Sequence, residues 1–447
     1  MPLIQLSKPC APGARRWTAV RILAGLLVAT RGVASPLSAQ QATGAADTGR
    51  ALTLSRSLTA ARESSPALRA AREAVIAARA RARQASALAN PTLGFGRERT
   101  TGAGQTNAQD IVALEQPLDF GGQRAARGSA AGARVRIAEA RLALAERDLT
   151  FETTRAYAML AAAQRRAGLA DESARTFAEA GRITTERLRA GDIAGYDARR
   201  LQLETARYVA QRADAMLALH GARVALASLM DVAPSSVAAA LTSEQVGSIP
   251  SIDSLTATAL ASRADLQVMQ HQVDVARADA RLAAAERLPV PTVSAGYKQE
   301  RIEDGRRATR SALHGFVAGF SVPLPLFDRR GGAIDAAAAD TRVREAEADT
   351  LRRRIRAEVN ATRAALEAVE TQLAVLRPHL GESMRNALRA VQAAYAEGEI
   401  TLSAWLDGVR AFQEAETTFA LLEADAIIRR AALERAVGTP LFPSASR

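Results

Sequence analysis

Lysine and cysteine are almost absent from this sequence. Of its 447 residues, only Lys8 and Lys298 are lysines and only Cys10 is a cysteine. A single cysteine excludes an intrachain disulfide and a cysteine pair for redox or metal chemistry. Cys10 also lies before the apolar stretch at 22–29, where no lipid-attachment site uses it.

Aromatic residues are scarce as well. They make up 4% of the chain, whereas 48% of its residues are hydrophobic. Alanine, leucine, arginine and glutamate dominate, which is typical of long helices that pack through small residues. The composition therefore predicts a mostly α-helical protein.

The positive charge of the chain is nearly all arginine. The formal net charge is +12, and residues 1–39 supply five basic residues and no acid, which leaves +7 for the rest. Arginine alternates with glutamate and aspartate along predicted helices, as in residues 352–358. We interpret this pattern as solvated helix faces and expect no nucleic-acid partner.

Motifs for catalysis or metal binding are also missing from the sequence. It contains no Ser-His-Asp arrangement, no glycine-rich phosphate loop and no cysteine pair, so we do not expect an enzyme. The four histidines have no ligand spacing, and the methionines are isolated as core methionines usually are. We therefore expect neither a metal site nor a cofactor. The histidines are His220, His271, His314 and His379.

The N-terminus has the pattern of an export signal. Basic residues up to Arg21 precede the apolar stretch at 22–29, and small residues end at Ala39. We predict that residues 1–39 are a signal peptide. The apolar stretch is shorter than the roughly 20 residues that a membrane-spanning helix needs, and no later run in the sequence reaches that length. A membrane-inserted form would then have to be a β-barrel.

The rest of the chain repeats one order of features. Proline-initiated segments and Gly-x-Ile turns recur at offsets of 200 to 207 residues, which predicts an internal duplication. We place the first repeat at 40–251 and the second at 252–447. The matched positions are Pro91 with Pro291, Pro117 with Pro323, and Gly191 with Gly398.

Each predicted repeat contains a β-hairpin between long helices. Alternating side chains and intervening turn residues predict strands at about 91–118 and again at about 291–322. Four strands of roughly ten residues fit a tilted outer-membrane strand, but even small barrels of this kind need about eight. Several chains must therefore share one barrel.

The helices carry coiled-coil spacing. From Leu351 to Leu380, apolar residues recur at alternating intervals of three and four. The helix from Gly122 to Arg187 has 66 residues, or about 99 Å at 1.5 Å per residue. We expect the two long helices to bend near Pro378 and Gly168. An ordinary helical bundle is the alternative, but it leaves the paired hairpins without a role.

These features together resemble the TolC-type outer-membrane efflux proteins over essentially the whole chain after residue 39. The resemblance rests on the proline-initiated strand, the return strand ending at 116–122 or 322–328, the long helix and the Gly-x-Ile turn, each present twice. Segments 114–118 and 321–329 are most similar to the branch serving cobalt-zinc-cadmium resistance. The strand–helix junction residues are Pro117, Gly121, Gly122, Pro323, Pro325 and Phe327.

The resemblance implies a homotrimer whose twelve strands form one β-barrel in contact with outer-membrane lipid, continuous with a long periplasmic α-helical coiled-coil barrel. It implies a passive exit duct for an inner-membrane pump of the proton-driven resistance-nodulation-division class, reached through a periplasmic adaptor. Heavy-metal cations are the implied cargo. Drug efflux and type I protein secretion are alternative cargoes, and a periplasmic coiled-coil scaffold outside the membrane is a further alternative.

The resemblance places adaptor contacts at the two Gly-x-Ile turns, for which a plain helix-to-helix turn is the alternative reading. The carboxylates near these turns would form rings in a trimer, unless nearby Arg189, Arg199 and Arg200 neutralise them. The expected contact residues are Arg189, Ala190, Gly191, Asp192, Glu397, Gly398 and Glu399.

The resemblance also assigns a gate close to these turns. Asp407 falls on the inner gate ring, and Asp197 and Tyr395 fall on positions that hydrogen-bond between neighbouring helices to hold the entrance shut. The sequence departs from the family pattern at two positions. Ala404 replaces a second ring carboxylate, and Ile400 replaces the arginine that completes the latch.

Overall fold

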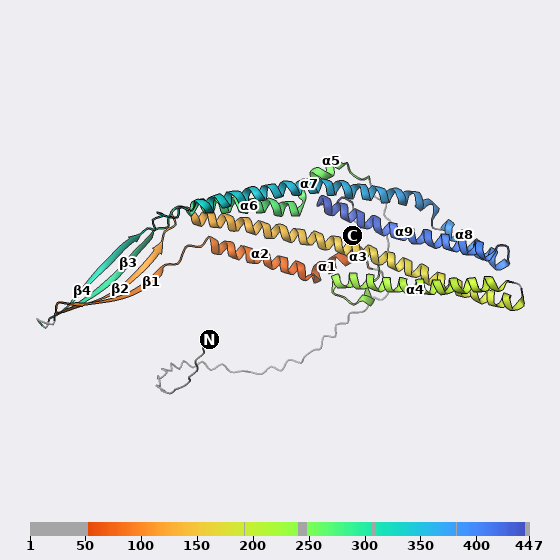
Figure 1. Ribbon diagram of the computed structural model, residues 1–447, viewed down its shortest axis with the longest axis horizontal. Helices are drawn as coiled ribbons and strands as arrows, with labels where there is room; N and C mark the ends of the chain where they lie inside the picture. The colour runs from red at the N-terminus through yellow and green to blue at the C-terminus, as the bar shows by residue number, and fades with distance from the viewer. Residues whose placement is uncertain are drawn as a thin grey trace, which may run out of the picture. The chain divides into compact units, whose positions relative to one another are not determined.

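The described chain consists of long helices and one four-stranded antiparallel sheet, which extends from one end of the helices (Figure 1). The computed structural model describes residues 52–191, 193–239, 248–304, 307, 309–380 and 382–442, all within the unit Thr48–Arg447. The predicted signal peptide, Asp192 and most of the turn between the last two strands lie outside the described residues. The elements are α1 (Leu54–Ser64), α2 (Pro66–Ala85), β1 (Thr92–Gly102), β2 (Gln105–Pro117), α3 (Gln123–Ala190), α4 (Gly195–Met230), α5 (Ile252–Ser262), α6 (Ala264–Ala285), β3 (Thr292–Asp304), β4 (Thr309–Ser321), α7 (Gly331–Leu376), α8 (Glu382–Glu397) and α9 (Leu402–Val437), with short 3₁₀ turns at Pro234–Ser236 and Arg377–His379.

The sheet joins the two halves of the chain. Its strand order is β1-β2-β3-β4, and β2 pairs with β3 from Gln105 opposite Asp304 to Pro117 opposite Thr292. The mostly α-helical fold with four strands, predicted from the sequence, is confirmed. The outer edges of β1 and β4 have no partner strand among the described residues.

The two faces of the sheet differ in chemistry. The register places Phe95, Val112, Tyr297 and Phe316 directly beside one another on one face. We call this the apolar face, and its large side chains are Leu93, Phe95, Val112, Leu114, Val293, Tyr297, Phe316 and Phe320, all exposed in this chain.

The opposite face consists mainly of glycine, small and polar residues, and we call it the polar face. Close strand contact explains one of its glycines, because a Cβ on Gly296 would lie 2.5 Å from the carbonyl oxygen of Val112. The charged residues of the polar face whose side chains are described are Glu98, Glu115, Lys298 and Glu300.

Helix α3 is the centre of the helical part, packing against α4, α6, α2 and α9, while α7 packs against α6 and α9. The predicted apolar seam of α7 is buried at Ile355, Val359 and Leu366, where it meets α9. As predicted near Pro378, α7 gives way to a 3₁₀ turn. Helix α3 is continuous through Gly168.

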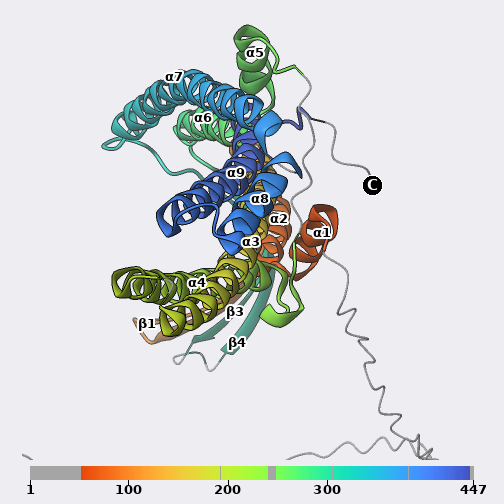
Figure 2. The same ribbon diagram turned by 90° about the vertical axis from the view of Figure 1, so that its right-hand side faces the viewer.

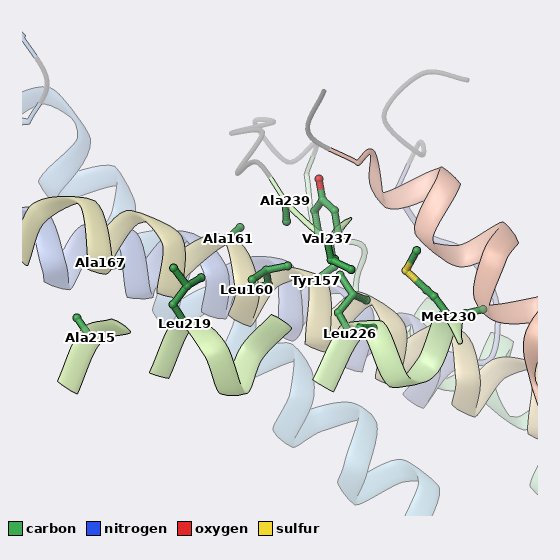
Figure 3. Close-up of a cluster of buried hydrophobic side chains, with 12 residues drawn as sticks. Tyr157, Leu160, Ala161, Ala167, Ala215, Leu219, Leu226, Met230, Val237 and Ala239 are labelled. Atoms are coloured by element: carbon green, nitrogen blue, oxygen red, sulfur yellow. The ribbon is translucent and has the colours of Figure 1, made fainter. Parts of the chain in front are cut away.

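A cluster of buried side chains holds α1, α3 and α4 together (Figure 3). Leu160 of α3 and Leu226 of α4 are fully buried in it. The hydroxyl of Tyr157 donates a 2.8 Å hydrogen bond to the carbonyl oxygen of Leu52 and so fixes the chain entering α1. Helices α1 and α2 are separated at Ser65, whose hydroxyl accepts a hydrogen bond from the Leu68 amide and caps α2.

Candidate functional site

Two glycine turns end the helical part of the molecule opposite the sheet. Helix α3 ends at Gly191 with φ of +86°, and α8 is followed by Gly398 with φ of +82°. Residues that carry a side chain rarely adopt this left-handed backbone conformation, which explains the glycine at both helix ends. No atom lies within 4 Å of a Cβ built on either glycine, so a side chain there would meet backbone strain and no steric clash.

The two turns lie side by side. A guanidinium nitrogen of Arg187 donates a 2.8 Å hydrogen bond to the carbonyl oxygen of Ala396, and the hydroxyls of Thr184 and Tyr395 are 3.4 Å apart. Both contacts join α3 to α8. Most residues predicted to contact an adaptor are exposed around these turns: Arg189, Ala190, Gly191, Glu397, Gly398 and Glu399. Asp192 lies outside the described residues.

An aromatic cluster supports the turns from below. Tyr395 of α8 stacks on Trp405 of α9 at a centroid distance of 5.1 Å, and Phe177 of α3 lies 5.0 Å from the same indole. Tyr208 of α4 stacks on Phe177 at 3.9 Å. Trp405 is 2% exposed. The cluster therefore couples the α3–α4 turn to the α8–α9 turn.

An ion pair lies beside this cluster. The Arg410 guanidinium of α9 is hydrogen-bonded to the Glu204 carboxylate of α4, and we call this contact the Glu204–Arg410 clasp. The side chains are 15% and 30% exposed, and Arg207 approaches Glu204 at 3.7 Å. Burial raises the pKa of Tyr208, which lies beside Arg410. The clasp links the two halves of the chain near their turns.

The predicted gate residues occupy different environments. The Asp407 side chain is 68% exposed, and its only recorded ion pair among the described residues is a 3.8 Å contact with Arg410. Asp197 lies half-buried in the first turn of α4, where a carboxylate is favoured by the helix dipole. Tyr395 meets Thr184 and Trp405 and forms no recorded hydrogen bond with Asp197 in this chain.

The alternative in which nearby arginines neutralise the turn carboxylates finds no support within one chain. No ion pair joins Arg189, Arg199 or Arg200 to a described carboxylate. Glu397 and Glu399 are exposed and have no cationic partner among the described residues. These carboxylates therefore keep their negative charge available at the turns.

The strand–helix junctions form a second distinct region. Gly122 has φ of +76° at the start of α3, and the Asp119 carboxylate accepts a 3.0 Å hydrogen bond from the Gln123 amide. The Gln123 side chain donates to the carbonyl oxygens of Ala285 and Leu288, which ties the first junction to the second half. Pro117 ends β2, and Pro323 and Pro325 follow β4. The exposed apolar side chains here are Phe120, Leu324, Leu326 and Phe327, the last fully exposed.

Sequence reasoning missed the clasp, Phe177 and Tyr208. Their partners come from helices that are distant in the sequence, and no local motif marks them. Among the described residues, no group of three or more His, Cys, Asp or Glu side chains is placed to hold a metal ion.

A family model described as "Outer membrane efflux protein" matches this chain twice, at residues 57–231 and 255–439. The chain is 28% identical over 268 residues to the cobalt-zinc-cadmium resistance protein CzcC of Cupriavidus metallidurans, a match covering 57% of this chain and 58% of that protein. It is 27% identical over 306 residues to the nickel-cobalt-cadmium resistance protein NccC of Alcaligenes xylosoxydans xylosoxydans, covering 65% of this chain and 63% of that protein. The matches therefore span less than two thirds of either relative.

The fold is also similar to a solved structure of CusC. The TM-score is 0.70 at 17% identity, and the match covers 86% of this chain and 92% of that one. At this identity the similarity concerns the fold alone.

Proposed function

Because the chain belongs to the outer membrane efflux protein family, we propose that it is the outer-membrane channel of a tripartite efflux system, a passive duct from the periplasm to the exterior. The family consists of channels and not of enzymes. The observation that carries the proposal is the sheet, whose large apolar side chains are 36–92% exposed and need a cover that the described residues do not supply. Lipid provides that cover if the sheet is part of a barrel.

A homotrimer completes such a barrel. The open edges of β1 and β4 present unpaired backbone groups, and lipid does not tolerate an open sheet edge. Four strands are too few to close a barrel, whereas three copies supply twelve. Pairing of β4 with β1 of the next copy removes every edge.

An exposed seam on α4 supports the same assembly. Tyr196, Leu203, Leu217 and Val224 recur at multiples of seven residues and are 72%, 74%, 72% and 42% exposed. Helix α4 packs mainly against α3 (Figure 2). The side chains of the seam are therefore uncovered by the described part of this chain. A heptad seam fits a neighbouring helix of a second copy.

The composition of α4 also corrects one sequence expectation. By length and hydropathy alone α4 qualifies as a candidate membrane span, although none was expected after the N-terminus. Charged residues along α4, including Glu204 and Arg212, form ion pairs with neighbouring helices. We therefore assign its exposed apolar residues to contacts between subunits in the periplasm.

The proposed duplication divides the chain into repeats at 40–251 and 252–447. The two family-model matches at 57–231 and 255–439 support it. So does the central pairing of β2 with β3, which places one hairpin from each repeat side by side. Each repeat then contributes one hairpin to the barrel and one glycine turn to the periplasmic end.

The glycine turns are the proposed docking site for a periplasmic adaptor, which connects the duct to an inner-membrane pump of the resistance-nodulation-division class. Backbone at a positive-φ glycine lets another chain approach closely, and the Cβ position of both glycines is open. The neighbouring carboxylates and Arg189 surround the turns with charge. Asp197, Tyr395 and Asp407 are proposed to close the entrance between neighbouring subunits.

The proposed cargo is heavy-metal cations. The names of CzcC and NccC support this class. The polar face has three described carboxylates, those of Glu98, Glu115 and Glu300, and one cation, Lys298. If that face lines the lumen, three copies give it excess negative charge, which lowers the potential for entering cations.

The proposal predicts a cation-selective pore in planar bilayers. Glu98→Gln and Glu115→Gln together should reduce the selectivity for zinc over chloride, measured as a shift in reversal potential across a zinc chloride gradient. Glu303→Gln is the matched control, because it removes a carboxylate from the opposite face of the same sheet. A pore that prefers anions, or one whose selectivity responds equally to the control, overturns the cation-duct assignment.

A further inference from the structure

Beyond its aromatic residues, the apolar face becomes strongly basic. Proceeding from Tyr297 toward the hairpin turns, the same face carries four arginines on three strands. Successive residues on one face are about 6.6 Å apart, so the arginines begin just above the aromatic row. We call this set the outer arginine patch, and it comprises Arg97, Arg99, Arg301 and Arg310.

The patch keeps a surplus of positive charge after its internal ion pairs are counted. Arg97 donates two hydrogen bonds to Asp110, at 2.6 and 2.9 Å, and Arg301 lies 3.9 Å from the same carboxylate. Arg310 pairs with Glu303 at 3.2 Å. Four guanidiniums thus face two carboxylates. Arg99 has no ion-pair partner among the described residues.

Arg99 and Arg301 frame an open position. Both are register partners of Ala108, which lies between them on β2. Two strand spacings put their backbones about 9.6 Å apart, with only a methyl group in the middle. Two guanidiniums that reach inward from such a spacing can hydrogen-bond one phosphate group from both sides.

The surplus of positive charge is confined to this face, because Lys298, the one described cation of the polar face, pairs with Glu300 at 3.1 Å. The polar face carries Glu98 and Glu300 at the same height on the sheet, so the basic patch is no general property of the strands. The outer arginine patch lies directly next to the aromatic residues of the apolar face. A ligand that covers both must have an apolar body and an anionic head.

We infer that the outer arginine patch binds the phosphate groups of anionic lipid headgroups in the outer leaflet, with the acyl chains of the same lipid on the apolar face. The inference rests on the proposed function, because it requires the sheet to be a membrane barrel with its hairpin turns on the outside. Basic clusters beside an apolar belt bind anionic headgroups in this way. Bound lipid would then span β1, β2 and β3 of each subunit.

The test uses the full-length protein purified in mild detergent as its native oligomer. Native mass spectrometry measures apparent binding of three probes: a diphosphorylated acylated glucosamine disaccharide, the same lipid without phosphates, and inorganic pyrophosphate. Arg99→Gln removes the unpaired arginine, and Arg99→Gln with Arg301→Gln removes both framing residues. Lys298→Gln is the matched control, since it removes one positive charge from the opposite face of β3.

The expected result is tight binding of the phosphorylated lipid alone. Binding should weaken about fivefold with Arg99→Gln and about 25-fold with the double variant, while Lys298→Gln changes nothing. Heat-modifiable migration of each variant on gels checks that the barrel is intact. Equal binding of phosphorylated and phosphate-free lipid, or an equal loss in the Lys298 variant, overturns the inference.

Three further outcomes are decisive. If pyrophosphate binds as tightly as the phosphorylated lipid, the patch is a free-anion site and the lipid assignment fails. If the wild-type protein forms no oligomer and does not insert into bilayers, the proposed function fails and the inference fails with it. Insertion and conductance without phosphate-dependent lipid binding overturns the inference alone.

Discussion

Arg410 on α9 is hydrogen-bonded to Glu204 on α4, across the boundary between the two halves of the chain. The resemblance to efflux proteins predicts a latch near the glycine turns. In this sequence Ile400 replaces the arginine of that latch. Arg410 Nε and Glu204 Oε2 are buried without a hydrogen-bond partner, so the clasp is incompletely satisfied.

Breaking the clasp on one side should destabilise the inner end. Arg410→Met leaves the Glu204 carboxylate partly buried with only the 3.7 Å contact to Arg207, which should cost about 1–3 kcal/mol of unfolding free energy. Adding Glu204→Gln should recover part of that loss and raise the open probability of single channels. Arg429→Gln on the same helix is the control, because its pair with Asp425 is exposed and should matter by less than about 0.5 kcal/mol. If the Arg410→Met variant has the same unfolding free energy as the Arg429→Gln control, the Glu204–Arg410 clasp does not stabilise the protein.

Loosening the gate should raise conductance. Asp197→Ala removes a half-buried carboxylate, and Tyr395→Phe removes a hydroxyl while keeping the ring against Trp405. Both should increase open probability in planar bilayers, modestly because the latch arginine is already absent. Asp425→Asn serves as the control, because its ion pair with Arg429 lies on α9 outside both the proposed gate and the α4 seam. Unchanged conductance and open probability in both gate variants removes these residues from the gate.

Adaptor docking should depend on the glycine turns. Gly191→Arg and Gly398→Arg should weaken docking while leaving the oligomer intact, since neither residue lies in a strand or a buried seam. Gly191→Ala and Gly398→Ala are matched controls that introduce the same positive-φ strain, about 1–2 kcal/mol, without the bulk or charge.

Trp405 provides the readout for this experiment. If residues 1–39 are removed as predicted, it is the only tryptophan left, because Trp17 is the other. The indole is buried against Tyr395 and Phe177, so its fluorescence should change when a tryptophan-free adaptor repacks the turns. Wild-type docking and efflux by both arginine variants would place the contact elsewhere.

Acid should remove one stabilising contact at the junction of α6, α7 and α9. Burial favours the neutral form of Asp265, but hydrogen bonding and attraction from Arg263 outweigh it and hold the pKa of Asp265 below its ordinary value. A lowered folded-state pKa gives stability that is present above the unfolded value, about 3.9, and is lost as pH falls through the folded value. Arg263 also donates to Glu358 and to the carbonyl oxygen of Ala436.

The test is thermal unfolding of wild type and Asp265→Asn as a function of pH. The two proteins should differ by a constant amount above about pH 5, and the difference should disappear in stronger acid. Asp425→Asn, whose exposed pair joins neighbouring turns of one helix, should show little pH-dependent difference. A gap between wild type and Asp265→Asn that widens on acidification would contradict the assigned sign.

The sequence predicted the features that depend on local chemistry. Proline and glycine marked the strand starts and helix ends, and alternation of side chains located the hairpins, because these signals act over a few residues. The clasp and the Phe177–Tyr208 stack could not be predicted. They depend on which side of each long helix faces its neighbour. Small errors in the assumed rotation per turn add up along a long helix, so the sequence does not fix that side.

Two sequence expectations show the limits of single residues as markers. Helix α3 is continuous through Gly168, since one glycine in a long helix costs only about 1 kcal/mol, and the bend expected there stays a prediction. The sequence did not predict an apolar seam on α4, because charged residues are interspersed among its apolar ones. The exposure of these apolar residues follows from the packing of α3 against the other side of α4.

The most direct test of the central claim is the oligomeric state of the membrane-extracted protein. Cells are fractionated, the outer membrane is dissolved in mild detergent, and the mass of the protein–detergent complex is measured by light scattering with detergent subtracted. The account predicts recovery from the outer membrane at three times the mass of the processed chain, with migration that changes on heating. A water-soluble monomer would contradict it.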